Sequence, residues 1–381
     1  MKDKKNIYFD NAATTFPKPE CVINEMISCM KNYCANPGRS GHKLAMRSNK
    51  AVYDARCEIA GFFNAPDPLH VIFTKNATES LNIVANTLAE IGGHIIITAY
   101  EHNSVIRALY RFCKIDKLRY DIIVPNETGC IDPVDIENSI EKDTIAVLVS
   151  LASNITGYIL PVKQIGEICK KHNIIYAIDV SQGAGTIRPD MIDNNVNIIA
   201  GTGHKDLYGP QGTGFICTDG FQPAPLLYGG TGTDSMSSDP PVIIPEMLEA
   251  GTLNLPGIVG LAEGIKFIKK IGNQKIIRHK QALINYMSYG LENIKKITSY
   301  IPDFNCGIVA IDIADMDSQE AVQILSEKYG ICTRGGFHCS PNVHRFLKTD
   351  GKGLIRFSFG IFNDRNEIDY TLNALEFLKI D

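Results

Sequence analysis

Side chains able to do acid–base and nucleophilic chemistry follow a series of short apolar runs that have the composition of β-strands. Thr74–Glu79 follow the run 71–73, Glu101-His102-Asn103 follow 94–98, Ser153-Asn154 follow 144–150, Asp179–Gln182 follow 174–178, and Thr202–Lys205 follow 196–200. In open α/β sheets, ligands bind beyond the carboxyl ends of the strands. We therefore expect an amine, a carboxylate, an imidazole, an amide and a helix start to meet at one sheet edge.

This combination fits pyridoxal phosphate. Lys205 would form the Schiff base, Asp179 would keep the pyridine nitrogen protonated, and a flat ring such as His102 would cover one face. The amides at the start of a helix near Thr78 would hold the phosphate. Each residue alone has an ordinary structural role open to it, such as a solvated lysine after a glycine turn or an aspartate that caps a helix. The cofactor is favoured because all of these residues occur together.

A second group lies near the carboxyl end, in the run Cys332-Thr333-Arg334-Gly335-Gly336-Phe337-His338-Cys339-Ser340-Pro341. Arg334 and the later Arg356 are candidates for a bidentate clamp on a substrate carboxylate. Cys339 lies in a glycine-rich polar loop, where an exposed and activated thiol is possible. From the local sequence alone, a loop cysteine with no chemical role is the alternative.

The elements that must position these residues alternate along the chain. Helical patterns over 79–89, 104–112 and 161–172 separate strands that are apolar on both faces, which predicts a mainly parallel sheet covered on both sides. After residue 257 a long helical stretch extends to about residue 294. Strand and helix patterns resume near 307–313 and 354–359, which indicates a smaller α+β domain from about residue 258 onward.

Composition excludes several classes of protein. The 381 residues carry a net charge of -4, without the basic excess of a protein that binds nucleic acid or a membrane surface. The apolar runs are far shorter than the roughly 20 residues that span a bilayer, and we expect no signal peptide. The 11 cysteines are scattered without a CxxC pair, which is typical of reduced thiols in the cytoplasm.

Five segments together resemble the class V aminotransferases of fold-type I, and within them the cysteine desulfurases and selenocysteine lyases. They are Tyr8–Thr15, Asn36-Pro37 with Gly41-His42, Phe73–Asn82, Glu249–Thr252 and the lysine segment Thr202–Gly212. The resemblance covers nearly the whole chain. It implies a large, mainly parallel seven-stranded domain over 15–257 and a small domain formed by 1–14 and 258–381.

The resemblance also implies a role for each matching residue. Catalysis would involve Lys205, Cys339, His102 and Asp179; the cofactor would contact Ala77, Thr78, His102, Asn154, Asp179, Gln182, Thr202, His204 and Lys205; and the substrate would contact Arg356, Arg334 and Asn154. Thr252 would reach the phosphate of a partner subunit, so the chain would form a homodimer with shared sites. No metal ligand is implied.

Cys339 matches the position at which cysteine desulfurases accept sulfur as a persulfide, and its short distance from Arg334 resembles the group with a compact cysteine loop. The expected reaction converts L-cysteine to L-alanine and passes sulfur to an acceptor protein, with L-selenocysteine as a possible substrate. Phe337 replaces a histidine of that group and Gly335 replaces a threonine, which affects the expected substrate and acceptor more than the chemistry. Two alternatives stay open: a transaminase or β-lyase on the same scaffold, and a non-enzymatic scaffold protein.

Overall fold

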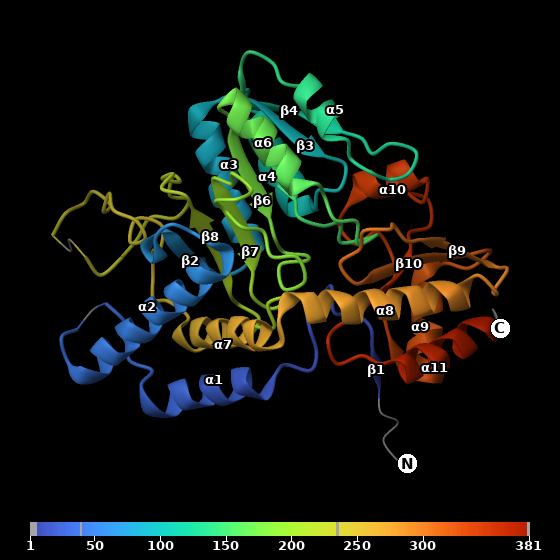
Figure 1. Cartoon of the computed structure of the whole chain (residues 1–381). Coiled ribbons are helices and arrows are strands. Elements are labelled where there is room, and N and C mark those ends of the chain that lie inside the picture. The colour runs from blue at the N-terminus through green and yellow to red at the C-terminus, as the bar shows by residue number, and fades with distance from the viewer. Residues whose placement is uncertain (1–5, 39, 234–235, 379–381) are drawn as a thin grey trace.

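A computed structural model describes residues 6–38, 40–233 and 236–378. At its centre lies a seven-stranded sheet in the order β2-β8-β7-β6-β5-β3-β4 (Figure 1). The strands are β2 (Val71–Thr74), β3 (Gly93–Thr98), β4 (Leu118–Ile123), β5 (Thr144–Ser150), β6 (Ile175–Asp179), β7 (Ile198–Thr202) and β8 (Gly214–Thr218). Strands β4, β3, β5, β6 and β7 are parallel to one another, whereas β8 is antiparallel to both β7 and β2. The mainly parallel sheet predicted from the sequence is confirmed.

Alternate residues of the central strands enter two separate cores. In β5, Val147 and Val149 pack with α2 (Lys43–Phe63), α6 (Val162–His172) and α7 (Leu255–Ile271). Ala146 and Leu148 point to the other face, where α3 (Ala77–Ile91) and α4 (Asn103–Cys113) cover the sheet. Side chains alternate across a strand, so burial on both faces requires a nearly continuous apolar run. Helix α1 (Glu20–Asn32) packs on α7, and the short α5 (Pro133–Asn138) packs on α6.

The carboxyl-terminal part has its own antiparallel sheet in the order β12-β10-β9, formed by β9 (Ile297–Tyr300), β10 (Ile308–Ile313) and β12 (Ile355–Ser358). Helices α8 (Asn273–Leu291), α9 (Ser318–Tyr329) and α11 (Arg365–Glu376) share a third core with it. The N-terminal β1 (Ile7–Tyr8) pairs in parallel with β11 (Ile331–Cys332), which joins the start of the chain to this part. A 3-10 turn (Pro68–His70) precedes β2, and α10 (Pro341–Leu347) follows the cysteine loop.

The expected helical stretch from 257 to about 294 is two helices, because Gly272 has a φ of +90° and ends α7. Ile258, Leu261 and Ile265 of α7 pack in the core under the large sheet. The division into 15–257 and 1–14 with 258–381 stays a prediction, and residues 1–5 and 379–381 lie outside the described residues. Among the described helices, none is both long and apolar enough to cross a bilayer.

Candidate active site

A cavity with about 550 Å³ of empty space opens at the carboxyl ends of β5, β6 and β7. Its walls include nine residues that were predicted to contact a cofactor: Ala77, Thr78, His102, Asn154, Asp179, Gln182, Thr202, His204 and Lys205. Asn76, Ser104, Ser150, Ala152 and Ser181 complete the lining. The chain therefore brings together residues that lie far apart in the sequence, such as Ala77 and Lys205, which are 128 positions apart.

Lys205 lies in the turn that follows β7. Glycine is needed at position 203, because a Cβ atom there would lie only 2.4 Å from the hydroxyl oxygen of Thr213. Burial lowers the pKa of the Lys205 amine from 10.5 to about 8, although the carboxylate of Asp179 opposes this shift. A substantial fraction of neutral amine near pH 8 is what a Schiff-base lysine needs.

Asp179 is the last residue of β6 and pairs in register with Ser150 of β5 and Ala200 of β7. Its Oδ1 accepts hydrogen bonds from the amide (2.8 Å) and the hydroxyl (2.5 Å) of Ser181. Burial raises the pKa of this carboxyl group, while the bonds from Ser181 oppose the shift. A buried carboxylate in this position fits a cationic ring nitrogen, which would offset the cost of its burial.

His102 caps the amino end of α4. Its Nδ1 accepts a hydrogen bond from the amide of Ser104 (3.1 Å) and lies 2.8 Å from the Ser104 hydroxyl. Burial, followed by the charge of Lys205, lowers the pKa of His102 to about 4. The imidazole is therefore neutral near pH 7, and a neutral flat ring is suited to stacking on an aromatic cofactor.

The predicted phosphate end of the cavity is the amino end of α3. Asn76 caps this helix by accepting a hydrogen bond from the amide of Glu79 (2.9 Å), and the helix begins at Ala77. In the same cavity lining, Nδ1 of His204 is buried and has no hydrogen-bond partner within the described ranges. An unpaired buried nitrogen beside a helix start fits a bound phosphate, which would supply the missing partner. The residues present therefore fit pyridoxal phosphate.

Arg356 of β12 is almost completely buried. Its guanidinium donates to Oδ1 of Asp10 (2.9 Å) and to the main-chain oxygen of Asn154 (2.8 Å), while its Nε has no hydrogen-bond partner among the described residues. Arg334 is exposed, and its backbone pairs with that of Arg356. The two arginines predicted from the sequence therefore lie side by side, and Asp10 is a partner that sequence reasoning did not assign.

Cys339 is exposed, and the loop that carries it is bound to the edge of the cavity. Its main-chain oxygen accepts a hydrogen bond from the amide of Asn103 (2.8 Å). The side-chain amide of Asn154 donates to the main-chain oxygen of His338 (2.6 Å) and accepts from the Ser340 hydroxyl (2.6 Å). These bonds hold the loop beside the cavity rim, in a backbone with positive φ at His338 (48°) and Cys339 (60°).

The residue that departs from the family pattern, Phe337, is about half exposed. Its ring packs edge-on against His344, with 5.3 Å between ring centroids. The neighbouring His338 is buried, and its Nε2 lies 3.0 Å from the main-chain oxygen of Leu354. Burial keeps the pKa of His338 well below its usual value, so this imidazole is neutral.

Sequence reasoning missed Lys18, which lies behind the lysine turn. Its ammonium donates to the main-chain oxygen of His204 (2.6 Å) and to the hydroxyl of Thr15 (2.7 Å). The hydroxyl groups of Thr14 and Thr15 also donate to that oxygen. Burial lowers the pKa of Lys18 to about 8. No spacing rule connects Lys18 with a turn almost 190 residues later, so only the fold could identify it.

Glu101 was also missed as a buried acid, although it precedes His102. Its two carboxyl oxygens accept hydrogen bonds from Thr98 (2.7 Å) and Ser150 (2.7 Å), and burial raises its pKa to about 7. Its position after a strand was a usable signal.

Thr252 does not line the cavity of its own chain. It is exposed and lies in a separate hollow together with Phe73 and Glu79. Glu249, three residues earlier, is fixed by a buried ion pair with Arg56 and by the amide of Phe73 (2.7 Å). The contact of Thr252 with a partner subunit stays a prediction.

A lysine and a carboxylate at neighbouring strand ends, with a ring and a helix start around them, define the fold-type I enzymes that bind pyridoxal phosphate. Comparison with known proteins agrees with this class. The model of the aminotransferase class-V family matches residues 7–371. The chain belongs to this family, and pyridoxal phosphate is its cofactor.

The curated relatives that resemble this chain span almost its whole length. A probable cysteine desulfurase of Pyrococcus abyssi is 34% identical and covers 97% of this chain and 93% of its own length. A cysteine desulfurase of Wigglesworthia glossinidia brevipalpis is 33% identical, with coverage of 97% and 92%. Among solved structures, the apo form of a cysteine desulfurase from Thermococcus onnurineus NA1 superposes with a TM-score of 0.90 at 30% identity, over 98% of this chain and 94% of that one.

Proposed function

We propose that this chain is a cysteine desulfurase that converts L-cysteine to L-alanine and retains the sulfur on Cys339 as a persulfide. One observation carries the proposal: the exposed thiol of Cys339 belongs to a loop that is hydrogen-bonded to Asn103 and Asn154, at the rim of the cavity that contains Lys205. A transaminase would have no need for a thiol at this place.

Each residue of the site has a distinct part in the proposed reaction. Arg356 and Arg334 bind the substrate carboxylate, which orients the amino acid. When bound, pyridoxal phosphate withdraws electrons from the substrate α-carbon. Lys205 takes the α-proton on its Nζ and returns a proton later, because its lowered pKa lets the amine act as a base near pH 8. With the cofactor bound, Asp179 would stabilise positive charge at its ring nitrogen, and His102 would cover its ring.

The sulfur step belongs to Cys339. Its thiolate attacks the sulfur of the substrate, so that a new S–S bond forms while the bond from sulfur to Cβ breaks. The electron pair of the broken bond stays with the organic fragment, which takes up protons and leaves as alanine. The persulfide then passes its outer sulfur to an acceptor thiol from solvent, which the exposure of Cys339 permits.

Three finer assignments accompany the proposal. The enzyme acts as a homodimer in which Thr252 contacts the cofactor phosphate of the partner subunit. It acts in the cytoplasm, consistent with eleven free cysteines. L-selenocysteine is a second substrate, whose selenium can leave without a persulfide on Cys339.

Cys339→Ala tests the proposal, with the exposed Cys21→Ala as the matched control. With L-cysteine, we expect alanine production by Cys339→Ala to fall by at least about two orders of magnitude, because the nucleophile is lost. Mass spectrometry after one turnover should detect one added sulfur on Cys339 in the unaltered chain and in Cys21→Ala. Unchanged alanine and sulfide production by Cys339→Ala would refute the desulfurase mechanism. Survival of selenocysteine cleavage alone would support the second substrate.

A further inference from the structure

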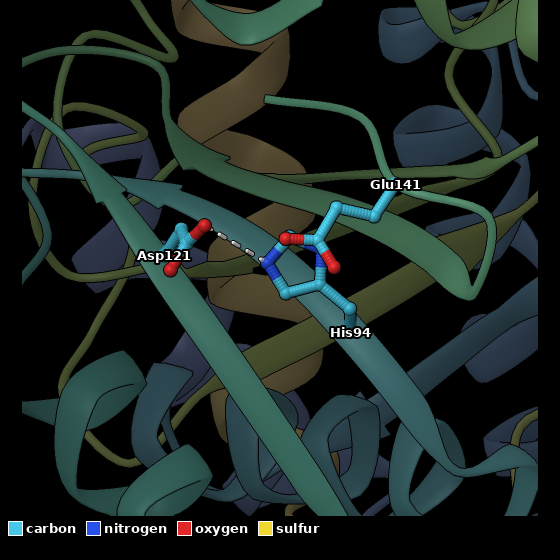
Figure 2. A group of neighbouring side chains, drawn as sticks. All are labelled: His94, Asp121 and Glu141. Atoms are coloured by element: carbon cyan, nitrogen blue, oxygen red, sulfur yellow. Dashed lines mark ion pairs between the residues drawn. The ribbon is translucent and has the colours of Figure 1, made fainter. Parts of the chain in front are cut away.

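A second cluster of ligand-type side chains lies at the opposite end of the sheet from the cavity. His94 is the second residue of β3, Asp121 is on β4, and Glu141 lies in the loop before β5. Figure 2 shows the three side chains converging from these segments. Because β3 and β4 are parallel and the cavity lies beyond the carboxyl ends of the strands, this cluster near the amino end of β3 is a separate place in the molecule.

His94 provides the first argument that something binds here. The residue is completely buried, and its Nδ1 lies 2.8 Å from the hydroxyl oxygen of Thr144. Its Nε2 is buried too, yet it has no hydrogen-bond partner in the part of the chain that the structure describes. The nearest charged group is Oδ2 of Asp121 at 3.5 Å, which is longer than an ordinary N–H···O bond. This buried nitrogen therefore lies within ion-pair distance of a carboxylate but makes no hydrogen bond to it (Figure 2).

The second argument is the geometry of the cluster. One ligand atom from each of His94, Asp121 and Glu141 lies within 4.8 Å of the others. Ligands bound to zinc at about 2.0–2.2 Å lie roughly 3–4 Å from one another. The side chains of Asp121 and Glu141 are 57% and 50% exposed, so small rotations can close the remaining distance. Their exposure also gives an ion a path of entry.

The surroundings fit a bound cation as well. The Thr144 hydroxyl accepts a hydrogen bond from the amide of Glu141 (2.7 Å) and can accept another from Nδ1–H of His94, leaving the Nε2 lone pair free. Histidines that bind metals usually donate from their other ring nitrogen in this way. Arg119 bonds to Oε2 of Glu141, which leaves Oε1 as the oxygen available to an ion.

We propose that His94, Asp121 and Glu141 form a binding site for Zn²⁺, completed by water. Two carboxylates neutralise the ion, and an imidazole with carboxylate oxygens is a ligand set that zinc accepts. The ion joins β3, the edge strand β4 and the loop before β5, so its role is to fasten this edge of the sheet. The three ligands are far apart in sequence, which explains why no metal motif was predicted.

Zinc binding to the full-length, cofactor-loaded protein tests the proposal. After treatment with a chelator, equilibrium dialysis against Zn²⁺ should show one zinc ion bound per chain. Asp121→Asn and His94→Gln should not bind this ion. Loss of a partner outside the ligand shell costs about 10–100-fold in affinity, so Thr144→Val should weaken binding about tenfold and a lost ligand at least about 100-fold. Asp143→Asn is the matched control: it removes one charge from the same loop and another partner of Arg119, but no ligand.

Two further measurements identify the ligand atoms and the effect of the ion on stability. X-ray absorption at the zinc edge should show nitrogen and oxygen neighbours, because the proposed ligands are an imidazole and two carboxylates. Sulfur neighbours would mean that a cysteine holds the ion. Zn²⁺ should raise the melting temperature of the unaltered chain and of Asp143→Asn, but not that of Asp121→Asn. Equal zinc binding by Asp121→Asn and the unaltered chain, or sulfur ligands, would overturn the proposal. Asp121 and Glu141 are exposed, so Asp121→Asn and Glu141→Gln keep the test decisive even if His94→Gln does not fold.

Discussion

The cavity and the cysteine loop differ in nearly every physical property. The cavity is built from the ends of buried strands, and burial moves the pKa values of Lys205, Asp179 and His102 away from their usual values. The loop exposes the thiol of Cys339 and adopts positive φ at two residues that are not glycine. Control of protons benefits from the exclusion of water, whereas delivery of sulfur to another molecule requires an open surface. On the proposed mechanism, the site divides the reaction between a buried half and an exposed half.

The largest effect should come from the buried half of the site. Lys205→Ala removes the proposed base and covalent anchor, so alanine production should fall by about 10³-fold or more. Lys75→Ala, at an exposed lysine near the start of α3, serves as the control. Cofactor uptake by the cofactor-free protein should accelerate as the pH approaches 8 and then level off, because the neutral amine of Lys205 reacts and its pKa is about 8. Cofactor absorbance follows the uptake. An uptake rate that keeps rising toward pH 10 would contradict the lowered pKa of Lys205.

A smaller effect is expected at Lys18, which supports the lysine turn without reaching the cavity. A hydrogen bond from a charged donor contributes about 1.5–3 kcal/mol, so Lys18→Met should lower kcat by roughly tenfold or more with little change in KM. Lys18→Arg should restore most of the activity.

The pH profile distinguishes this role from a purely structural one. The pKa of Lys18 is lowered to about 8, so its ammonium loses its charge above that pH and the activity of the unaltered chain should decline. Lys18→Arg stays charged and should not show this decline. Identical pH profiles for the unaltered chain and Lys18→Arg would refute this role of Lys18.

Asn154 and Ser340 show whether the two halves act independently. Ser340→Ala removes one hydrogen bond of the loop, which contributes about 1 kcal/mol, and should lower kcat only a few-fold without changing the cofactor spectrum. Asn154→Ala removes contacts in both halves and should also alter the spectrum. A spectral change in Ser340→Ala would mean that the halves are coupled more tightly than this division allows.

The last effect concerns stability instead of catalysis. The pKa of His102 is about 4 in the folded chain, against an ordinary value of 6.5, so between these values the unfolded chain binds more protons. The free energy of unfolding should therefore decrease as the pH falls from 6.5 to 4, and His102→Gln should remove roughly 2–3 kcal/mol of that decrease. Denaturant unfolding of the cofactor-free protein at a series of pH values measures this free energy. The control is His172→Gln, which changes a histidine in a partly exposed ion pair.

The parts of the site that the sequence predicted are those that depend on chain order alone. Asp179 and Lys205 follow apolar runs, and parallel strands align their carboxyl ends, so their meeting in one cavity could be anticipated. The antiparallel pairing of β8 between β7 and β2 could not, because register depends on contacts distant in sequence. Lys18 and Asp10 act on partners that only the folded chain brings near. The positive φ of His338 and Cys339 could not be predicted either, because glycine is the residue that usually marks such a backbone conformation in a sequence.

The N-terminal segment has a consequence for the order of folding. Asp10 bonds to Arg356, 346 positions later, and Asn11 bonds to the main-chain oxygen of Ser358, 347 positions later. These partners are synthesised long after residues 10 and 11, and contacts of such high sequence separation form slowly. The strands of the large sheet are synthesised before β11, so this sheet can form while β1 is still unpaired. The proposed substrate site around Arg356 therefore forms only after residues 356–358 have joined the N-terminal segment.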